Sequence, residues 1–156
     1  MAWNSPANYS EGQLITPTIW NAQIYDNMTW LKTPPSNRMA IVTQNTASAS
    51  FVAVTGVSLA ITTEGGSVLI RFCGSFYNTG VNNNFLDFGI DGAGVGDATN
   101  GLQYFTTPVA NYRSGIGFEW VSGALSAAAH TVTLRWKTTA GTLTMENGGQ
   151  FSVREV

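Results

Sequence analysis

Residues 67–90 hold two segments in which apolar side chains recur at every second position, separated by the Asn- and Gly-rich segment 78–84. Successive side chains of a strand point to opposite faces, so one set in each segment can face a core. These sets are Val68, Ile70 and Phe72 in the first segment and Leu86, Phe88 and Ile90 in the second. Because Asn and Gly favour turns, the pattern predicts two neighbouring strands of one sheet.

Similar short runs recur throughout the last hundred residues, with Gly-containing turn sequences such as 64–66, 91–92 and 147–149 between them. No second helical pattern interrupts them, and no internal repeat is evident. Many short strands with such turns predict an antiparallel β-sandwich or barrel, so the fold class is mainly β. We expect strands at 51–54, 58–63, 67–77, 84–90, 102–106, 113–121, 131–138, 142–145 and 150–156.

The first fifty residues follow a different pattern, which predicts an extended arm containing one short α-helix. Thr16 and Pro17 are residues that begin helices, and the prolines at 34 and 35 end one. Between them, apolar residues at spacings of four, four and three form one stripe. Residues 38–50 are interpreted as a linker with a short strand at its start. The domains expected are therefore 1–48, the arm and helix, and 49–156, the β-domain.

The arm and helix carry aromatic and apolar side chains but have no core of their own. The stripe either packs back onto the β-domain or docks on another protein, and the sequence favours docking because aromatic anchors dominate buried protein contacts. The residues expected to form this anchor are Trp3, Tyr9, Trp20, Ile24, Tyr25, Met28, Trp30 and Leu31.

Charged residues make up only 10% of the chain, against about 25% in an average domain. A surface so poor in charge is expected to be covered in part by protein. The seven Lys and Arg residues are scattered singly, which argues against nucleic acid as a partner. The start lacks the features of a signal peptide, and the longest apolar stretch is too short to span a bilayer. We expect a protein made in a cytoplasm, with no membrane partner.

Catalytic and metal-binding constellations are not evident in the sequence. Cys73 and His130 are the sole residues of their types, so a disulfide within the chain and a cysteine zinc site are excluded. Cys73 is interpreted as a small apolar strand residue, and His130 as a strand-end residue with a local hydrogen bond. Asp87, Asp91 and Asp97 surround a Gly-rich loop that is either solvated or a calcium site. No pair of carboxylates is singled out for glycoside hydrolysis. We expect no enzyme activity, cofactor or metal.

Four segments of the β-domain resemble the C1q/TNF-like jelly rolls of tailed-phage structural proteins. They are residues 51–59 (FVAVTGVSL), the pair at 91–92, residues 130–136 (HTVTLRW) and residues 151–156 (FSVREV). Residues 12–31 (GQLITPTIWNAQIYDNMTWL) are similar to the short head- or tail-binding leaders of phage proteins. The resemblance implies a homotrimer, an N-terminal virion anchor and no catalysis.

Within this class we expect a capsid decoration protein on the capsid surface of the virion. Its trimers would lie at three-fold or quasi-three-fold positions and reinforce the shell of major capsid protein. The alternative is a tail-fibre or receptor-binding tip protein, in which the loops at 92–101 and 108–113 recognise a ligand on the host surface. An enzyme acting on polysaccharide is disfavoured, because the sequence offers no catalytic constellation.

Overall fold

The computed structural model describes residues 7–156, which form two compact units that divide between Pro35 and Ser36. The sequence placed this boundary near residue 48 instead. Residues 36–46 form two strands that pair with the β-domain, so the segment interpreted as a linker belongs to the sandwich. Among the described residues, no helix is long and apolar enough to cross a membrane. Trp3 lies outside the described residues.

The N-terminal unit contains one continuous helix of three segments: α1 (Pro17–Trp20), η1 (Asn21–Tyr25) and α2 (Asp26–Lys32). The hydroxyl of Thr16 accepts a hydrogen bond from the amide of Ile19, so this residue caps the helix as the sequence predicted. The middle segment η1 is a π-helix, a widened turn that the apolar spacing did not reveal. Residues 7–15 have no regular structure apart from a turn at 11–12.

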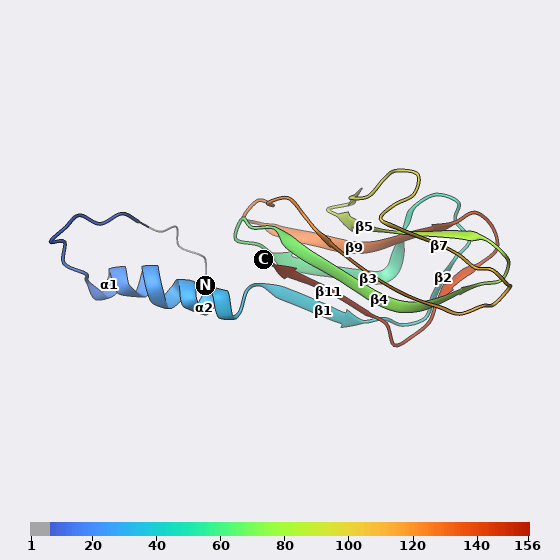
Figure 1. The fold of residues 1–156 in the computed structure, drawn as a ribbon, viewed down its shortest axis with the longest axis horizontal. Coiled ribbons are helices and arrows are strands. Elements are labelled where there is room, and N and C mark those ends of the chain that lie inside the picture. Colours follow the sequence, from blue (N-terminus) through green and yellow to red (C-terminus); the bar gives the residue numbers. More distant parts are fainter. Residues whose placement is uncertain (1–6) are drawn as a thin grey trace. The chain divides into compact units, whose positions relative to one another are not determined.

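The C-terminal unit is a sandwich of two antiparallel sheets, which confirms the predicted fold class (Figure 1). Sheet A has the order β1-β11-β4-β10-β2, and β8 also pairs with β4. Sheet B has the order β3-β9-β5-β6, and β7 also pairs with β5. The first strand of the sandwich therefore pairs with the last, as in a jelly roll. The bounds are β1 Ser36–Ala40, β2 Gln44–Thr46, β3 Val52–Thr62, β4 Val68–Asn78, β5 Asn83–Ile90, β6 Ala93–Gly94, β7 Gln103–Thr106, β8 Ser114–Val121, β9 Ala129–Thr138, β10 Leu143–Met145 and β11 Gln150–Glu155.

The core lies between the sheets and follows the period-two pattern of the sequence. In β4 the predicted set faces inward, and in β9 the inward set is Val132, Leu134 and Trp136. Phe88 of β5 stacks on Phe118 of β8 with ring centroids 4.4 Å apart, which joins the two sheets. Cys73, interpreted as a small apolar strand residue, does lie in β4 but on its exposed outer face.

A buried polar cluster closes one end of the sandwich, where β4, β5 and β9 end or begin. Asn78, Asn84 and Thr138 are each exposed by 1% or less. The amide nitrogen of Asn78 donates to the side-chain oxygens of Asn84 and Thr138, each at 2.9 Å. Asn84 in turn donates to the buried hydroxyl of Thr107 at 2.8 Å. Every member has a partner, so the cluster can fix the strand ends relative to one another.

Candidate functional site

The apolar stripe of the N-terminal helix is exposed along its whole length. Trp20 is 53% exposed, and Met28 and Leu31 are each 64% exposed. Trp20, Met28 and two further predicted anchor residues, Ile24 and Tyr25, line a hollow of about 340 Å³ with Thr29. The structure therefore gathers the central predicted residues on one surface, which we call the helix stripe (Trp20, Ile24, Tyr25, Met28 and Leu31).

Two other predicted anchor residues are placed differently. Tyr9 is 42% exposed and lies in the irregular segment that precedes the helix. Trp30 is half-buried within the helical unit and does not line the hollow. The arm is held to the helix by a hydrogen bond of 3.1 Å from the backbone amide of Ala7 to the side chain of Gln23. This contact involves none of the residues of the helix stripe.

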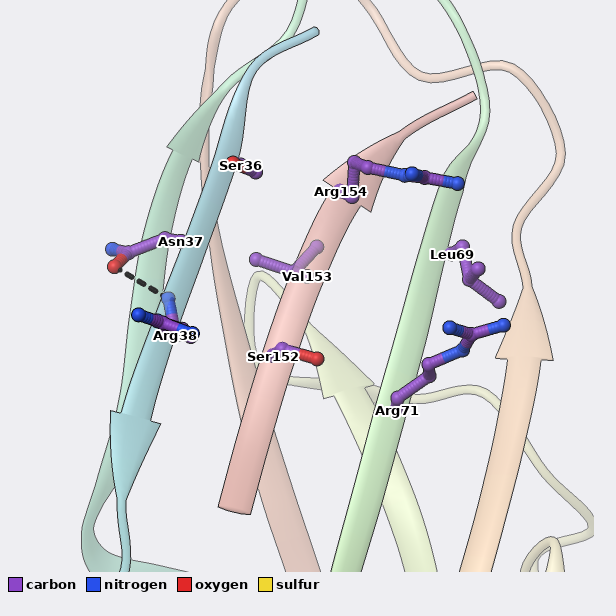
Figure 2. Close-up of a pocket in the computed structure, with 8 residues that line it drawn as sticks. All are labelled: Ser36, Asn37, Arg38, Leu69, Arg71, Ser152, Val153 and Arg154. Carbon is purple, nitrogen blue, oxygen red and sulfur yellow. Dashed lines mark hydrogen bonds between the residues drawn. The ribbon is translucent and has the colours of Figure 1, made fainter. Parts of the chain in front are cut away.

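A groove of about 410 Å³ on the outer face of sheet A brings together three arginines from three adjacent strands. Arg38 lies on β1, Arg154 on β11 and Arg71 on β4, and in Figure 2 Leu69 lies between the side chains of Arg154 and Arg71. Ser152 of β11 is paired with both Arg38 and Arg71 in the sheet register. We call this feature the arginine groove.

The arginine groove is positively charged in a protein whose net charge is -2. Arg71 donates from Nε to Glu119 at 2.8 Å, but both side chains are about 60% exposed, so the pair contributes at most about 1 kcal/mol. Three guanidinium groups against this one carboxylate leave a local excess of two positive charges. A guanidinium presents a planar fork of donors, which fits carboxylate, phosphate or sulfate oxygens.

His130 is bonded on both sides of its ring. Its Nδ1 lies 2.7 Å from a carboxylate oxygen of Asp91, and its Nε2 lies 3.0 Å from the backbone carbonyl of Ser126. Both partners only accept hydrogen bonds, so the ring satisfies both when both nitrogens carry protons. These bonds, that to Asp91 first, raise the pKa of His130. The pKa of Asp91 is lowered by its bonds to the amide of Thr131 and to the imidazole.

The hydroxyl of Ser126 also lies 3.4 Å from Nε2, so serine, histidine and aspartate follow one another as in a catalytic triad. A general base must accept the proton of the nucleophile, but Nε2 lies nearer to the carbonyl of Ser126, at 3.0 Å, than to its hydroxyl, at 3.4 Å. A carbonyl oxygen can only accept a hydrogen bond, so this contact favours the state in which Nε2 carries a proton and is not free to act as the base. The arrangement ties together the start of β9 and two loops, and it is the local hydrogen bonding expected of a strand-end histidine.

The three aspartates of the Gly-rich loop have separate partners. Asp91 bonds to His130, Asp97 accepts from the amides of Thr99 and Asn100 in its own loop, and Asp87 is buried under the loop. In the described part of the chain, no three His, Cys, Asp or Glu residues gather as metal ligands would. The calcium alternative therefore has no cluster of carboxylates among the described residues to support it.

Asp87 lies at the edge of a second hollow, of about 400 Å³, on the outer face of sheet B. It is 2% exposed, accepts a hydrogen bond of 2.8 Å from the amide of Gly96, and lies 3.8 Å from Arg135 Nη1. Burial raises the pKa of its carboxyl. Lys137 also lines this hollow, and its ammonium lies 4.8 Å from the ring centroids of both Phe51 and Phe85. We call this feature the sheet B cleft.

Sequence reasoning missed both the arginine groove and the sheet B cleft, because their residues are far apart in the chain.

No family model matches the chain, and no curated protein matches it. Among solved structures it is similar to part of a family GH115 4-O-methyl-alpha-glucuronidase with specificity for decorated arabinogalactans, at 11% identity and a TM-score of 0.41. That similarity covers 77% of this chain and 16% of the other. It is also similar to the C-terminal domain of the sugar-binding protein EclA, at 7% identity and a TM-score of 0.34, over 77% and 75% of the two chains. Similarities this distant carry no argument about function.

Proposed function

We propose that the chain is a capsid decoration protein of a phage virion, which binds the shell of major capsid protein as a homotrimer. The observation that carries the proposal is the helix stripe, an exposed apolar surface on a unit separate from the sandwich. The resemblance of residues 12–31 to virion-binding leaders supports the same role for this unit. The jelly-roll order of the sandwich supports membership of a class whose members form trimers.

The helix stripe suits docking into a groove of another protein. A helix of sixteen residues is marginal alone in water, and burying its apolar face in a groove both orders and anchors it. A trimer presents three such helices, so each bound helix raises the effective concentration of the others. A protein that binds the assembled shell but not its separated subunits stabilises the shell by linkage.

Substitutions on and off the stripe test the proposal. Trp20→Ser with Leu31→Ser removes two exposed anchors, whereas Thr18→Ser with Asn21→Ser changes two exposed residues outside the stripe as a matched control. Each variant is mixed with purified shells that lack the protein, and the shell-bound fraction is measured after sedimentation. We expect the control to bind like the wild type, and the stripe variant to remain soluble in the supernatant.

Deletion of residues 1–35, which removes the N-terminal unit and leaves β1 intact, gives the stronger version of the same test. We expect a folded, soluble sandwich that no longer joins particles. Normal decoration of shells by the shortened protein would show that the anchor lies elsewhere, and the proposal would then fail.

The second candidate is a tail-fibre or receptor-binding tip protein. The sheet B cleft favours it, because the loop expected to carry recognition in that case, 92–101, borders the cleft through Gly94 and Gly96. The copy number per virion, measured by quantitative mass spectrometry, separates the two candidates. A decoration protein is present in numbers comparable to the capsid protein, and a tail protein in far fewer copies.

A further inference from the structure

The outer face of sheet B carries a row of aromatic and cationic side chains that crosses adjacent strands. Phe85 of β5 is paired in register with Tyr104 of β7 on one side and with Lys137 of β9 on the other. The rings of Phe85 and Tyr104 have centroids 5.6 Å apart, and Tyr104 is 55% exposed. The ammonium of Lys137 lies between the rings of Phe85 and Phe51. The row thus presents apolar ring surface with one cation in its middle.

Beneath this row, the sheet B cleft contains a buried carboxylate with spare capacity to accept hydrogen bonds. Oδ1 of Asp87 accepts from the amide of Gly96, while Oδ2 lies 3.8 Å from Arg135, beyond hydrogen-bond distance. A carboxylate has about four acceptor positions, and the backbone amides of Phe88, Val95 and Gly96 all lower the pKa of Asp87 by hydrogen bonding, so about one position is left for a donor from a ligand. Its burial makes such bonds strong, since unpaired polar groups in a low dielectric are unfavourable.

Glycines permit the loop to lie directly on this pair of charges. A side chain at position 94 would collide with Asp87 and Arg135, and one at position 96 would come within 2.7 Å of Asp87 Oδ1. Any other residue at these two positions would fill the space around the carboxylate. A neighbouring hollow of about 300 Å³ shares Ala49 and Lys137 with the cleft, so the two hollows adjoin, and we refer to them together as the groove.

We propose that the sheet B cleft binds a saccharide that carries a carboxylate. The rings supply apolar surface for the C–H face of a sugar, Asp87 accepts from its hydroxyls, and Lys137 and Arg135 donate to its oxygens. Two cations against one buried carboxylate leave a single positive charge in the cleft, which matches one acidic group on the ligand. This inference does not rest on the virion assignment, because it concerns only the sandwich.

A nucleotide is the other ligand class that aromatic rings and cations commonly bind. The charge of the cleft disfavours it, because a phosphate monoester carries about -1.5 to -2 at neutral pH, whereas Arg135 and Lys137 against Asp87 leave a single positive charge. A sugar carboxylate carries one negative charge. The charge balance of the cleft therefore favours the acidic saccharide.

The test uses the full chain with galacturonate, galactose and adenosine monophosphate as probes, measured by saturation-transfer NMR and by isothermal titration. We expect galacturonate to bind and galactose to bind about tenfold or more weakly, because it lacks the charged partner of Lys137. Lys137→Met keeps the length of the apolar stem and should remove this preference for the acid. Phe85→Ala, which removes a ring that lines the groove, should weaken both sugars.

Arg113→Gln is the matched control, because this residue is paired with Glu146 and lines neither hollow of the groove. It should leave binding of both sugars unchanged, and thermal melts monitored by circular dichroism confirm that each variant is folded. The proposal is overturned if galacturonate gives no saturation transfer, if Lys137→Met binds it as the wild type does, or if adenosine monophosphate binds more tightly.

Discussion

We expect the stability of the sandwich to be especially sensitive to substitution of Asn78, which lies at the centre of the buried polar cluster. Its side chain has five hydrogen-bond partners: the two amide hydrogens are shared among Asn84, Thr138 and, at the longer distance of 3.2 Å, the carbonyl of Ala140, and the oxygen accepts from Gly80 and Asn82. A hydrogen bond contributes about 0.5–1.5 kcal/mol net, and Asn84 and Thr138 retain the bond between them. We therefore expect Asn78→Ala to lower the free energy of unfolding by roughly 3–5 kcal/mol.

This loss is a large share of the roughly 5–15 kcal/mol that stabilises a typical domain. Urea denaturation followed by far-UV circular dichroism measures it. Asn78→Asp keeps the volume of the side chain but replaces its donors with a carboxylate that faces other oxygens, so it should lose at least as much stability as Asn78→Ala, whereas a clearly smaller loss would assign the effect of Asn78→Ala to the cavity. Asn45→Ala, at an exposed position of β2, should change stability by less than about 0.5 kcal/mol. A loss below about 1 kcal/mol for Asn78→Ala would refute the reasoning.

Three further outcomes are expected. The pKa of His130 is raised in the folded protein, so its contribution to stability is fully present below pH 6.5, the pKa of an unfolded histidine, and is lost as the pH rises through the folded pKa. The pKa of Asp91 is lowered, so its contribution is present above pH 3.8, the pKa of an unfolded aspartate, and is lost as the pH falls through the folded pKa. Urea midpoints of wild type and His130→Gln should therefore converge as the pH rises from 5.5 to 8.5. Trp20→Ser with Leu31→Ser should weaken shell binding by roughly 2–3 kcal/mol, because more than half of the surface of each side chain is exposed and can be buried on binding. A dilution series of the sedimentation assay measures this change in affinity. Glu119→Gln should tighten binding of inorganic phosphate in the arginine groove, seen in NMR titrations, because it removes the carboxylate that competes for the arginine beside it.

Local pattern predicted most strands of the core, but residues 51–54 and 58–63, expected as two strands, form the single strand β3 with a bulge after Ala53. The alternation in residues 131–137 places Val132, Leu134 and Trp136 inward, and all three are buried in β9. The same alternation placed Cys73 opposite Phe72, which is why it lies on the outer face of β4 although its residue type favours burial. The two-residue alternation of side chains thus predicted which face of a strand is buried better than the type of residue did.

Strands held by long-range pairing were not predictable in this way. Residues 44–46 are polar and show no alternation, yet they form β2 because β10 pairs with them. The widened turn η1 leaves no trace in the spacing of the apolar stripe. Both features depend on hydrogen-bond partners and not on the hydrophobic pattern, which is the signal that a single sequence carries best.

The arginine groove and the sheet B cleft were also not predictable from local sequence pattern. The sequence separates the Lys and Arg residues, whereas the fold brings most of them together. A chain with so few charges appears to scatter its cations, but the register of distant strands gathers them. Three lie in the arginine groove, and two, Arg135 and Lys137, lie in the sheet B cleft, which makes five of the seven Lys and Arg residues. Charge that served only solubility would be spread over the whole surface and mixed in sign. The positive charge is instead concentrated on the outer faces of the two sheets, which is the arrangement expected if each face of the sandwich binds an acidic group.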